Sequence, residues 1–145
     1  MNNEMNILVS DTPREGILRL TMDDQKSGNA LSEEMMSILM KAIEKASIDD
    51  SVKVIILAAE GSIFSSGHNL KQITDAREQS EDGEPYFKQL FDQCSSLMQI
   101  LVNCPKPVIA QISGIATAAG CQLVATCDLA YASSSAKFAT PGVNL

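Results

Sequence analysis

Several residue types that would mark a particular chemistry are scarce in this chain of 145 residues. It has no tryptophan, only 4% aromatic residues and a single histidine, His68. Its four cysteines (Cys94, Cys104, Cys121 and Cys127) form no CxxC pair, which together with the single histidine argues against a zinc site or any other metal centre. We interpret these cysteines as reduced core residues.

Basic residues are also in short supply. The chain has 11 Lys and Arg against 18 Asp and Glu, a formal net charge of -7. Nucleic acids and anionic membranes both select basic surfaces, so neither is expected as a partner. No apolar run approaches the roughly 20 residues that cross a bilayer. Residues 1–16 lack the basic and apolar regions of a signal peptide, and their acids fit poorly with a mitochondrial transit peptide. These features predict a cytoplasmic protein.

Aliphatic residues supply what the aromatics do not. With 45% hydrophobic residues, the chain is long enough to form one domain over residues 1–145 with an aliphatic core. Residues 16–22 alternate apolar and polar side chains, which predicts a half-exposed strand. Residues 52–59 are almost continuously apolar, which is typical of a parallel strand covered on both faces. Residues 108–112 and 128–132 predict two further strands.

Segments whose apolar residues have helical spacing lie between these strands. Ser32 is a candidate N-cap for a helix that fades at residues 48–51, with Leu31 and Met36 placed as a hydrophobic staple. Residues 87–102 predict a second helix, and residues 73–84 a mobile loop or frayed helix. Strands that alternate with helices predict a mostly parallel α/β sheet with right-handed crossovers.

The stretch from Pro107 to Ala132 (PVIAQISGIATAAGCQLVATCDLAYA) organises the rest of the chain. It predicts a buried strand, a loop of small residues and a helix that begins near Ala119. Free N–H groups at a helix start can hold an oxyanion or a phosphate. Packing alone also explains small residues at such a corner, and that explanation is the commoner one. A P-loop is excluded because no Gly-Lys-Ser/Thr ending follows.

Two segments resemble one family. Residues 63–71, IFSSGHNLK, are similar to the F-x-[SA]-G-x-D-[LI]-K segment of the enoyl-CoA hydratase/isomerase (crotonase) superfamily. Residues 107–132 resemble its second signature, P-V-I-A-x-[IV]-x-G-x-A-x-G-G-G-x-[ED]-L-x-x-x-C-D, and the N-A-L-S run from Asn29 also fits. Order and spacing agree across nearly the whole chain, which thus looks like the N-terminal core portion of such a protein.

The resemblance implies an α/β fold of the crotonase type, a spiral of ββα units. It also implies CoA-thioester ligands in fatty acid metabolism, no cofactor apart from the coenzyme A of the substrate, and trimers or hexamers. The family's C-terminal helices would lie beyond Leu145. Without them, we expect this length not to form an independent monomer, because residues 52–59 and 87–102 need cover on more than one side.

The resemblance also assigns roles to individual positions. In the family two backbone N–H groups bind the thioester oxygen, and here they would belong to His68 and Ala119. The contacts with coenzyme A would carry over to Asn29, Ala30, Phe64, Ser66, Gly67 and Leu70. The acyl pocket would be bordered by Gly120, Gln122 and Pro141.

The departures from the family concern its acid–base chemistry. Gln122 and Gly142 stand where the hydratases have their two glutamates, and Asn69 stands where an aspartate is usual. An amide cannot take up and return a proton near neutral pH, and glycine has no side chain. His68 is the remaining titratable candidate. It would act either as an acid or base or, as we favour, through its backbone N–H alone, with the ring toward solvent or the CoA phosphates.

These observations leave three functional hypotheses. The leading one is an acyl-CoA-binding lyase or isomerase that is weak in hydration. The alternative is a non-catalytic CoA-thioester-binding or assembly subunit. A peptidase of the related Clp type is disfavoured, because no Ser/His/Asp set is visible at usable spacing.

Overall fold

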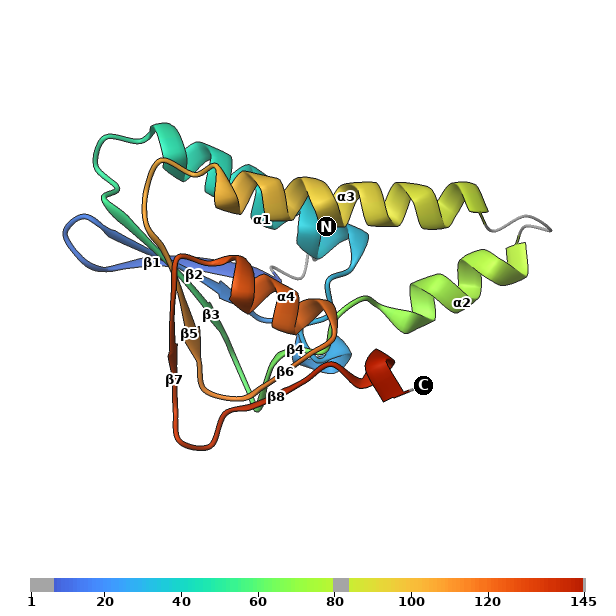
Figure 1. The fold of residues 1–145 in the computed structure, drawn as a ribbon. Helices are drawn as coiled ribbons and strands as arrows, with labels where there is room; N and C mark the ends of the chain where they lie inside the picture. The colour runs from blue at the N-terminus through green and yellow to red at the C-terminus, as the bar shows by residue number, and fades with distance from the viewer. Residues whose placement is uncertain (1–6, 80–83, 145) are drawn as a thin grey trace, which may run out of the picture.

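Two β-sheets and a set of helices make up the computed structural model, which describes residues 7–79 and 84–144 (Figure 1). The large sheet has the order β1-β2-β3-β5-β7, with β1 Leu8–Arg14, β2 Ile17–Met22, β3 Val54–Ala59, β5 Val108–Ile112 and β7 Leu129–Ala132. The small sheet has the order β4-β6-β8, with β4 Ile63–Ser65, β6 Ile115–Thr117 and β8 Lys137–Ala139. The helices are α1 Glu33–Ile48, α2 Leu70–Gln79, α3 Glu84–Val102 and α4 Ala119–Thr126, with short 3-10 turns η1 Gln25–Ser27 and η2 Pro141–Asn144.

The chain winds as a spiral. Apart from the antiparallel β1–β2 pair, the neighbouring strands in both sheets are parallel. Each turn therefore adds one strand to the large sheet and then one to the small sheet: β3 and β4, then β5 and β6, then β7 and β8. Helices follow β4 and β6, which gives the repeated ββα unit. The predicted α/β spiral is confirmed.

The start of α1 follows from its sequence. Ser32 has an extended backbone, and its hydroxyl accepts a hydrogen bond from the N–H of Met35 at 3.1 Å. The flanking apolar pair, Leu31 and Met36, is fully buried. An N-cap with a hydrophobic staple satisfies an otherwise unpaired N–H and fixes the angle at which the chain enters the helix. The predicted helix start is confirmed.

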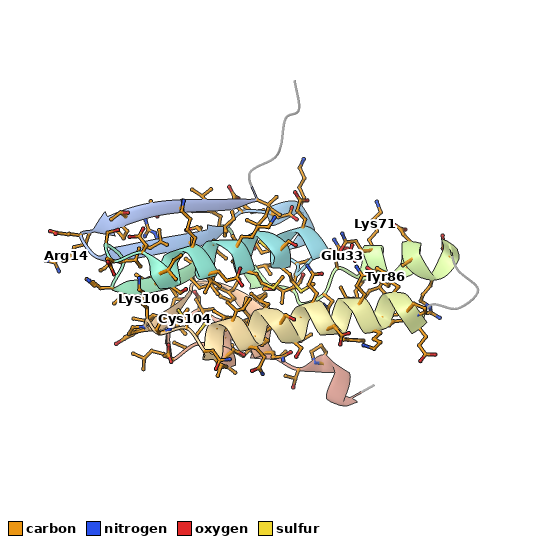
Figure 2. All side chains as sticks on the ribbon, turned by 90° about the horizontal axis from the view of Figure 1, so that it is seen from above. Arg14, Glu33, Lys71, Tyr86, Cys104 and Lys106 are labelled. Atoms are coloured by element: carbon orange, nitrogen blue, oxygen red, sulfur yellow. The ribbon has the colours of Figure 1, made fainter. Side chains whose placement is uncertain are left out.

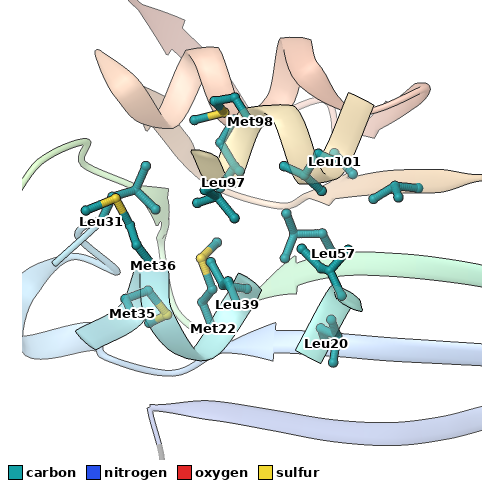
Figure 3. Packing of buried hydrophobic residues seen from close by; sticks show 14 of the residues in the cluster. Leu20, Met22, Leu31, Met35, Met36, Leu39, Leu57, Leu97, Met98 and Leu101 are labelled. Carbon is teal, nitrogen blue, oxygen red and sulfur yellow. The ribbon is translucent and has the colours of Figure 1, made fainter. Parts of the chain in front are cut away.

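The core lies between one face of the large sheet and the helices α1 and α3, which run side by side across it (Figures 1 and 2). Aliphatic and thioether side chains fill it, as expected of an aromatic-poor chain. Figure 3 shows Met22 and Leu57 of the sheet close to Leu39 of α1 and Leu97 of α3. Each of these side chains is at most 1% exposed.

The opposite face of the large sheet is less covered than the sequence predicted. In β3, Val54 and Ile56 are partly exposed, although a strand buried on both faces was expected there. The edge strand β7 is exposed at all four positions. A hollow of about 430 Å³ on this face is lined by β-strand residues that include Val9, Arg19 and Thr21.

The remaining differences concern short or polar segments. The three strands of the small sheet have three residues each; β4 and β6 were expected as loops, and no element was predicted for β8. Residues 73–84 were predicted as a mobile loop or frayed helix, and the helix alternative is confirmed as far as Gln79, where α2 ends; α3 begins at Glu84, earlier than the predicted residue 87. The part of the loop prediction that falls on residues 80–83 lies outside the described residues. No helix in the described ranges is long and apolar enough to cross a membrane.

The cysteines fit their predicted role as core thiols. All four are free, Cys94 is buried, and the others are partly buried. Burial, together with the nearby charge of Asp128, raises the pKa of Cys127 to about 12. That thiol therefore stays protonated and unreactive near neutral pH.

Candidate functional site

The two segments with family-like sequences meet at one edge of the small sheet. The first leaves β4 through Gly67 and His68, and the second leaves β6 through Ala118 and Ala119. Gly67 has φ +89°, and a Cβ added there would lie 3.0 Å from the Cβ of Ala118 and 3.1 Å from the backbone N of Ala119. The loops are thus in contact, and only a residue without a side chain fits at their closest point.

Strand pairing brings these loops together. Because β4 and β6 are parallel, with Ser65 opposite Ala116, both loops emerge at the carboxyl end of the sheet. The hydroxyl of Thr117 donates a hydrogen bond of 3.1 Å to the carbonyl of Ser66. Ligand sites of α/β proteins commonly lie at this end of parallel strands.

The start of α4 is built on an unusual backbone conformation. Ala118, the residue before the helix, has φ +50° and ψ -124°, a region that residues with a side chain seldom occupy. Its N–H donates to the carbonyl of Ala139 in β8 at 3.0 Å. Its carbonyl accepts from Cys121 at 3.0 Å and Gln122 at 3.2 Å. Strain of this kind persists only where the surrounding structure holds it in place.

Gly120 allows α4 to sit directly on β4. A Cβ on Gly120 would collide with the carbonyl oxygen of Ser65 and lie 2.8 Å from the Cβ of Ser65. Gly120 therefore supports the site by allowing the first turn of α4 to approach the β4 backbone.

Two N–H groups at this junction are left without a hydrogen-bond partner in the described ranges, those of His68 and Ala119. Their neighbours are paired: the N–H of Leu31 donates to the carbonyl of Gly67 at 2.7 Å, and Leu31 forms an isolated bridge with His68. Ala119 is the first residue of α4, where the helix dipole is positive. A pair of free donors at a helix start suits an oxygen that carries or gains negative charge.

The Asn29 side chain anchors the backbone next to the loop that follows β4. It is fully buried, has φ +50°, and all three of its side-chain hydrogen bonds are to the backbone. Its Oδ1 accepts from the N–H of Asp24 at 2.7 Å, and its Nδ2 donates to the carbonyls of Glu60 at 2.9 Å and Ile63 at 2.7 Å. The Asn29 side chain is thus committed to holding the turn before α1 against the β3–β4 connection.

The other predicted CoA-contact positions divide by exposure. Phe64 and Ala30 are 1% and 2% exposed, so they support the loop from within and offer almost no surface to a ligand. Ser66 is tied in by its N–H, which donates to Gly28 at 3.0 Å, and by its hydroxyl, which donates to Ser27 at 3.2 Å. Leu70 is 73% exposed at the start of α2. The set therefore contains residues that support the loop and one that faces outward.

Asn69 has a local role that the sequence analysis did not assign. Its Oδ1 accepts hydrogen bonds from the N–H groups of Lys71 at 3.1 Å and Gln72 at 3.2 Å, at the start of α2. Aspartate and asparagine both serve as N-caps, so asparagine at this position keeps the cap while removing a charge. The signal was an Asn directly before a run that can form a helix.

The His68 ring lies against α3. It packs edge to face on Phe91, with ring centroids 5.6 Å apart and an interplanar angle of 87°. Its Nδ1 is buried and makes no hydrogen bond within the described ranges. Burial lowers the pKa of His68, opposed by the nearby Leu31 backbone, so the ring is neutral near pH 7. This half-buried placement differs from the solvent-facing ring that the sequence analysis favoured.

The positions of the missing glutamates are open. Gln122 is exposed on α4, and Pro141 and Gly142 are exposed in η2. β8 pairs with β6 so that Ala139 lies opposite Thr117, and η2 follows directly. A Cβ on Gly142 would have no atom within 4 Å. Among the described residues, no three His, Cys, Asp or Glu side chains come together as they would around a metal ion.

Comparisons with known proteins agree with this architecture. The family model described as Enoyl-CoA hydratase/isomerase matches residues 12–145. The chain is 48% identical over 130 residues to the Xenopus laevis "Enoyl-CoA hydratase domain-containing protein 3, mitochondrial", covering 90% of this chain and 42% of that protein. It is 46% identical over 131 residues to the human protein of the same name, with the same coverage of each chain. The chain thus spans less than half the length of these curated relatives.

Solved structures share the fold. The crystal structure of human enoyl Coenzyme A hydratase domain-containing protein 3 matches with a TM-score of 0.86 at 43% identity. A Mycobacterium smegmatis enoyl-CoA hydratase matches with a TM-score of 0.86 at 42% identity. Each match covers 95% of this chain and 52% of the other.

The prediction of a cytoplasmic protein is wrong. The Xenopus, mouse and human relatives are all named as mitochondrial proteins, which points to that compartment instead. The prediction rested on the composition of the first 16 residues. In a chain that spans only part of its relatives, that stretch does not report the compartment.

Family and fold therefore rest on independent observations: a match over almost the whole chain, and a spiral that places the two characteristic segments side by side. The chain belongs to the enoyl-CoA hydratase/isomerase family.

Proposed function

We propose that the protein binds an acyl-CoA thioester and holds the thioester oxygen between the N–H groups of His68 and Ala119. The observation that carries this proposal is the contact between Gly67 and Ala119, with 3.1 Å from the Cβ position of Gly67 to the backbone N of Ala119. It lies between two loops that are far apart in the sequence, and each loop has an N–H without a partner among the described residues. Family membership adds that relatives are named as enoyl-CoA hydratases.

The chemistry of such a pair is to stabilise negative charge on oxygen. When a proton leaves the carbon next to a thioester, or a nucleophile adds to a conjugated thioester, charge moves onto the carbonyl oxygen. Donors fixed before the reaction cost little reorganisation, and removing one typically lowers kcat by about 10²- to 10³-fold. The constraints on Gly67, Ala118 and Gly120 are the kind of preorganisation this requires.

Water addition is expected to be weak. It needs one group to activate water and another to protonate the α-carbon. The two positions that carry glutamates in the hydratases are Gln122 and Gly142 here, and neither can do this work. The activity that fits is therefore an enoyl-CoA hydratase/isomerase type of chemistry, as lyase or isomerase, with slow hydration.

A second candidate is a non-catalytic subunit that binds CoA thioesters. It is favoured by the open, uncharged surroundings of Gln122 and Gly142. The two candidates differ in one measurement, because both predict thioester binding and only the enzyme predicts turnover.

Self-association to a trimer or hexamer is part of the proposal. Several large apolar side chains are exposed on the helices, among them Ile48 at 84% and Val102 at 63%. Exposed apolar surface of this kind commonly marks an interface. Light scattering of the intact protein tests this, and a stable monomer at high concentration would contradict it.

The binding proposal is tested by calorimetry with crotonyl-CoA, acetyl-CoA and crotonate. Both thioesters should bind, and free crotonate should not. Gly67→Ala places a methyl group between the two loops and should weaken thioester binding about tenfold, the equivalent of one or two hydrogen bonds. Gly16→Ala is the matched control, because Gly16 also has positive φ but faces the Lys53 side chain in the β1–β2 turn.

Equal binding of crotonate and crotonyl-CoA, or equal effects of the two glycine substitutions on affinity, would contradict the proposal.

A further inference from the structure

Aromatic residues are concentrated next to the oxyanion loop. The chain has four Phe and two Tyr, and three of these six lie in the first eight residues of α3: Tyr86, Phe87 and Phe91. Figure 2 places Tyr86 beside Glu33 at the start of α1 and Lys71 at the start of α2. A chain so poor in aromatics thus places half of them on the helix segment that faces the loop carrying His68.

Phe91 is the member of this group that contacts the loop. Its ring meets the His68 imidazole at 5.6 Å and 87°, yet it remains 55% exposed. Phe91 lies off the buried face of α3, which is formed by Leu90, Cys94, Leu97, Met98 and Leu101, so core packing does not explain it. Leu70, which follows His68 by two residues at the start of α2, is a second exposed apolar residue close to His68 in the sequence, at 73%.

Two rings at right angles form a corner. A third planar group can stack against one ring while turning its edge or face toward the other, which suits the quadrupoles of both. A saturated group of the same size buries similar area but gains no such orientation. Burial keeps the imidazole neutral, so the corner carries no charge that would repel an apolar group.

The corner is within reach of the thioester. An oxygen bound to the N–H of His68 lies about 3 Å from that nitrogen, and the imidazole is attached to the same residue. An acyl group that extends from this oxygen toward α3 would meet the imidazole first and then Phe91, whose ring centroid is 5.6 Å from that of His68.

We propose that Phe91 and the His68 ring form the acyl-recognition corner of this site and select planar, aromatic or conjugated acyl groups over saturated ones of equal size. This inference rests on the proposed function, because it requires the thioester oxygen to be held by the N–H of His68. Phe91 is then a specificity-determining residue.

The test compares benzoyl-CoA with cyclohexanecarbonyl-CoA, which share a six-carbon ring and differ in planarity. In the intact protein, calorimetry should give benzoyl-CoA about tenfold tighter binding, as expected for one or two aromatic contacts. Phe91→Leu should bring the ratio close to one while keeping an apolar side chain. Tyr131→Leu is the matched control, because Tyr131 is an exposed aromatic at 68% on β7, outside this corner, and should leave the ratio unchanged.

Equal affinities in the unchanged protein, or a ratio that survives Phe91→Leu, would overturn the inference. So would an equal loss of affinity for coenzyme A alone in Phe91→Leu, which would place the ring against the CoA portion. Acetyl-CoA separates this from failure of the proposed function: if acetyl-CoA and both ring thioesters fail to bind, the oxyanion proposal falls first, and this inference with it.

Discussion

The candidate site has two halves that are built in opposite ways. The backbone half, where Gly67 and His68 meet Ala118 and Ala119, is tightly constrained by strand pairing, by close approaches and by a strained residue. The side-chain half, at Gln122 and Gly142, is exposed and uncharged, with open space around Gly142. A larger side chain at Gly67 or Gly120 would force the backbone to move. A side chain at Gly142 would have room, because no atom lies within 4 Å of its Cβ position.

In the proposed function, the backbone half binds the thioester oxygen, whereas proton transfer would depend on the side-chain half. A backbone N–H is placed by the path of the chain, so His68 and Ala119 can serve wherever that path is kept. A catalytic carboxylate is placed by one side chain and is lost with a single substitution. A family fold can therefore keep its oxyanion donors while its hydration chemistry disappears.

The largest effect should follow a substitution in the backbone half. Gly120→Ala places a methyl group on the Ser65 backbone, which must move because a carbonyl oxygen cannot rotate away. Because this clash is with backbone, the overpacking should cost about 3 kcal/mol or more and lower the Tm by several degrees.

Thermal and urea unfolding of Gly120→Ala should be compared with Gly142→Ala, whose new methyl group meets no atom within 4 Å. Equal stability of the two variants would remove the contrast between the halves.

The next effect concerns the support of the first loop. Asn29→Ala removes the side chain that pairs with Asp24, Glu60 and Ile63, and takes a hydrogen-bond partner from each of those part-buried backbone groups. The loss should be about 2–3 kcal/mol in the free energy of unfolding. Asn69→Ala, which removes only a helix cap, should cost about 1 kcal/mol. If the two losses were equal, the first loop would not depend on Asn29.

A smaller effect should appear as a function of pH. Burial lowers the pKa of His68 in the folded state below its ordinary value of 6.5. Above pH 6.5 the ring is neutral in both states and contributes nothing. As pH falls from 6.5 toward the lower folded pKa, the unfolded state takes up the proton first, so the folded state loses stability.

His68→Gln removes this titration, and His68 is the only histidine in the chain. The stability of the unchanged protein relative to His68→Gln should therefore decline between pH 7 and pH 5, in urea unfolding at each pH. A constant difference would show that the ring is not desolvated.

The sequence predicted most of the larger elements because their patterns extend over several turns or alternations, although no strand was predicted for β1. The Ser32 cap and the apolar stripe of α1 span 16 residues, enough to show helical spacing. The small sheet was missed because strands of three residues, such as β4 and β6, cannot display alternation. Polar composition left residues 73–84 undecided between a loop and a frayed helix, and the start of α2 at Leu70 depends on the cap provided by Asn69.

For the site, the sequence identified the two loops, and the strand register supplied their contact. The close approach of Gly67 to Ala119 depends on the pairing of β4 with β6 and on the φ of Ala118, neither of which is a local property. The Phe91 contact with His68 was also out of reach, because the spacing in residues 87–102 predicts a helix but not which loop its exposed residues meet.

The central claim is that thioester binding and hydration are separated in this protein. The most direct test follows the loss of the enone absorbance of crotonyl-CoA with the intact protein, and then with the double change Gln122→Glu and Gly142→Glu. We predict hydration slower than in an ordinary family hydratase by about 10²-fold or more, with crotonyl-CoA still bound, and a faster rate in the double variant. Turnover of the unchanged protein equal to that of an ordinary hydratase would contradict the account and assign the proton transfer to another group, with His68 the first to examine.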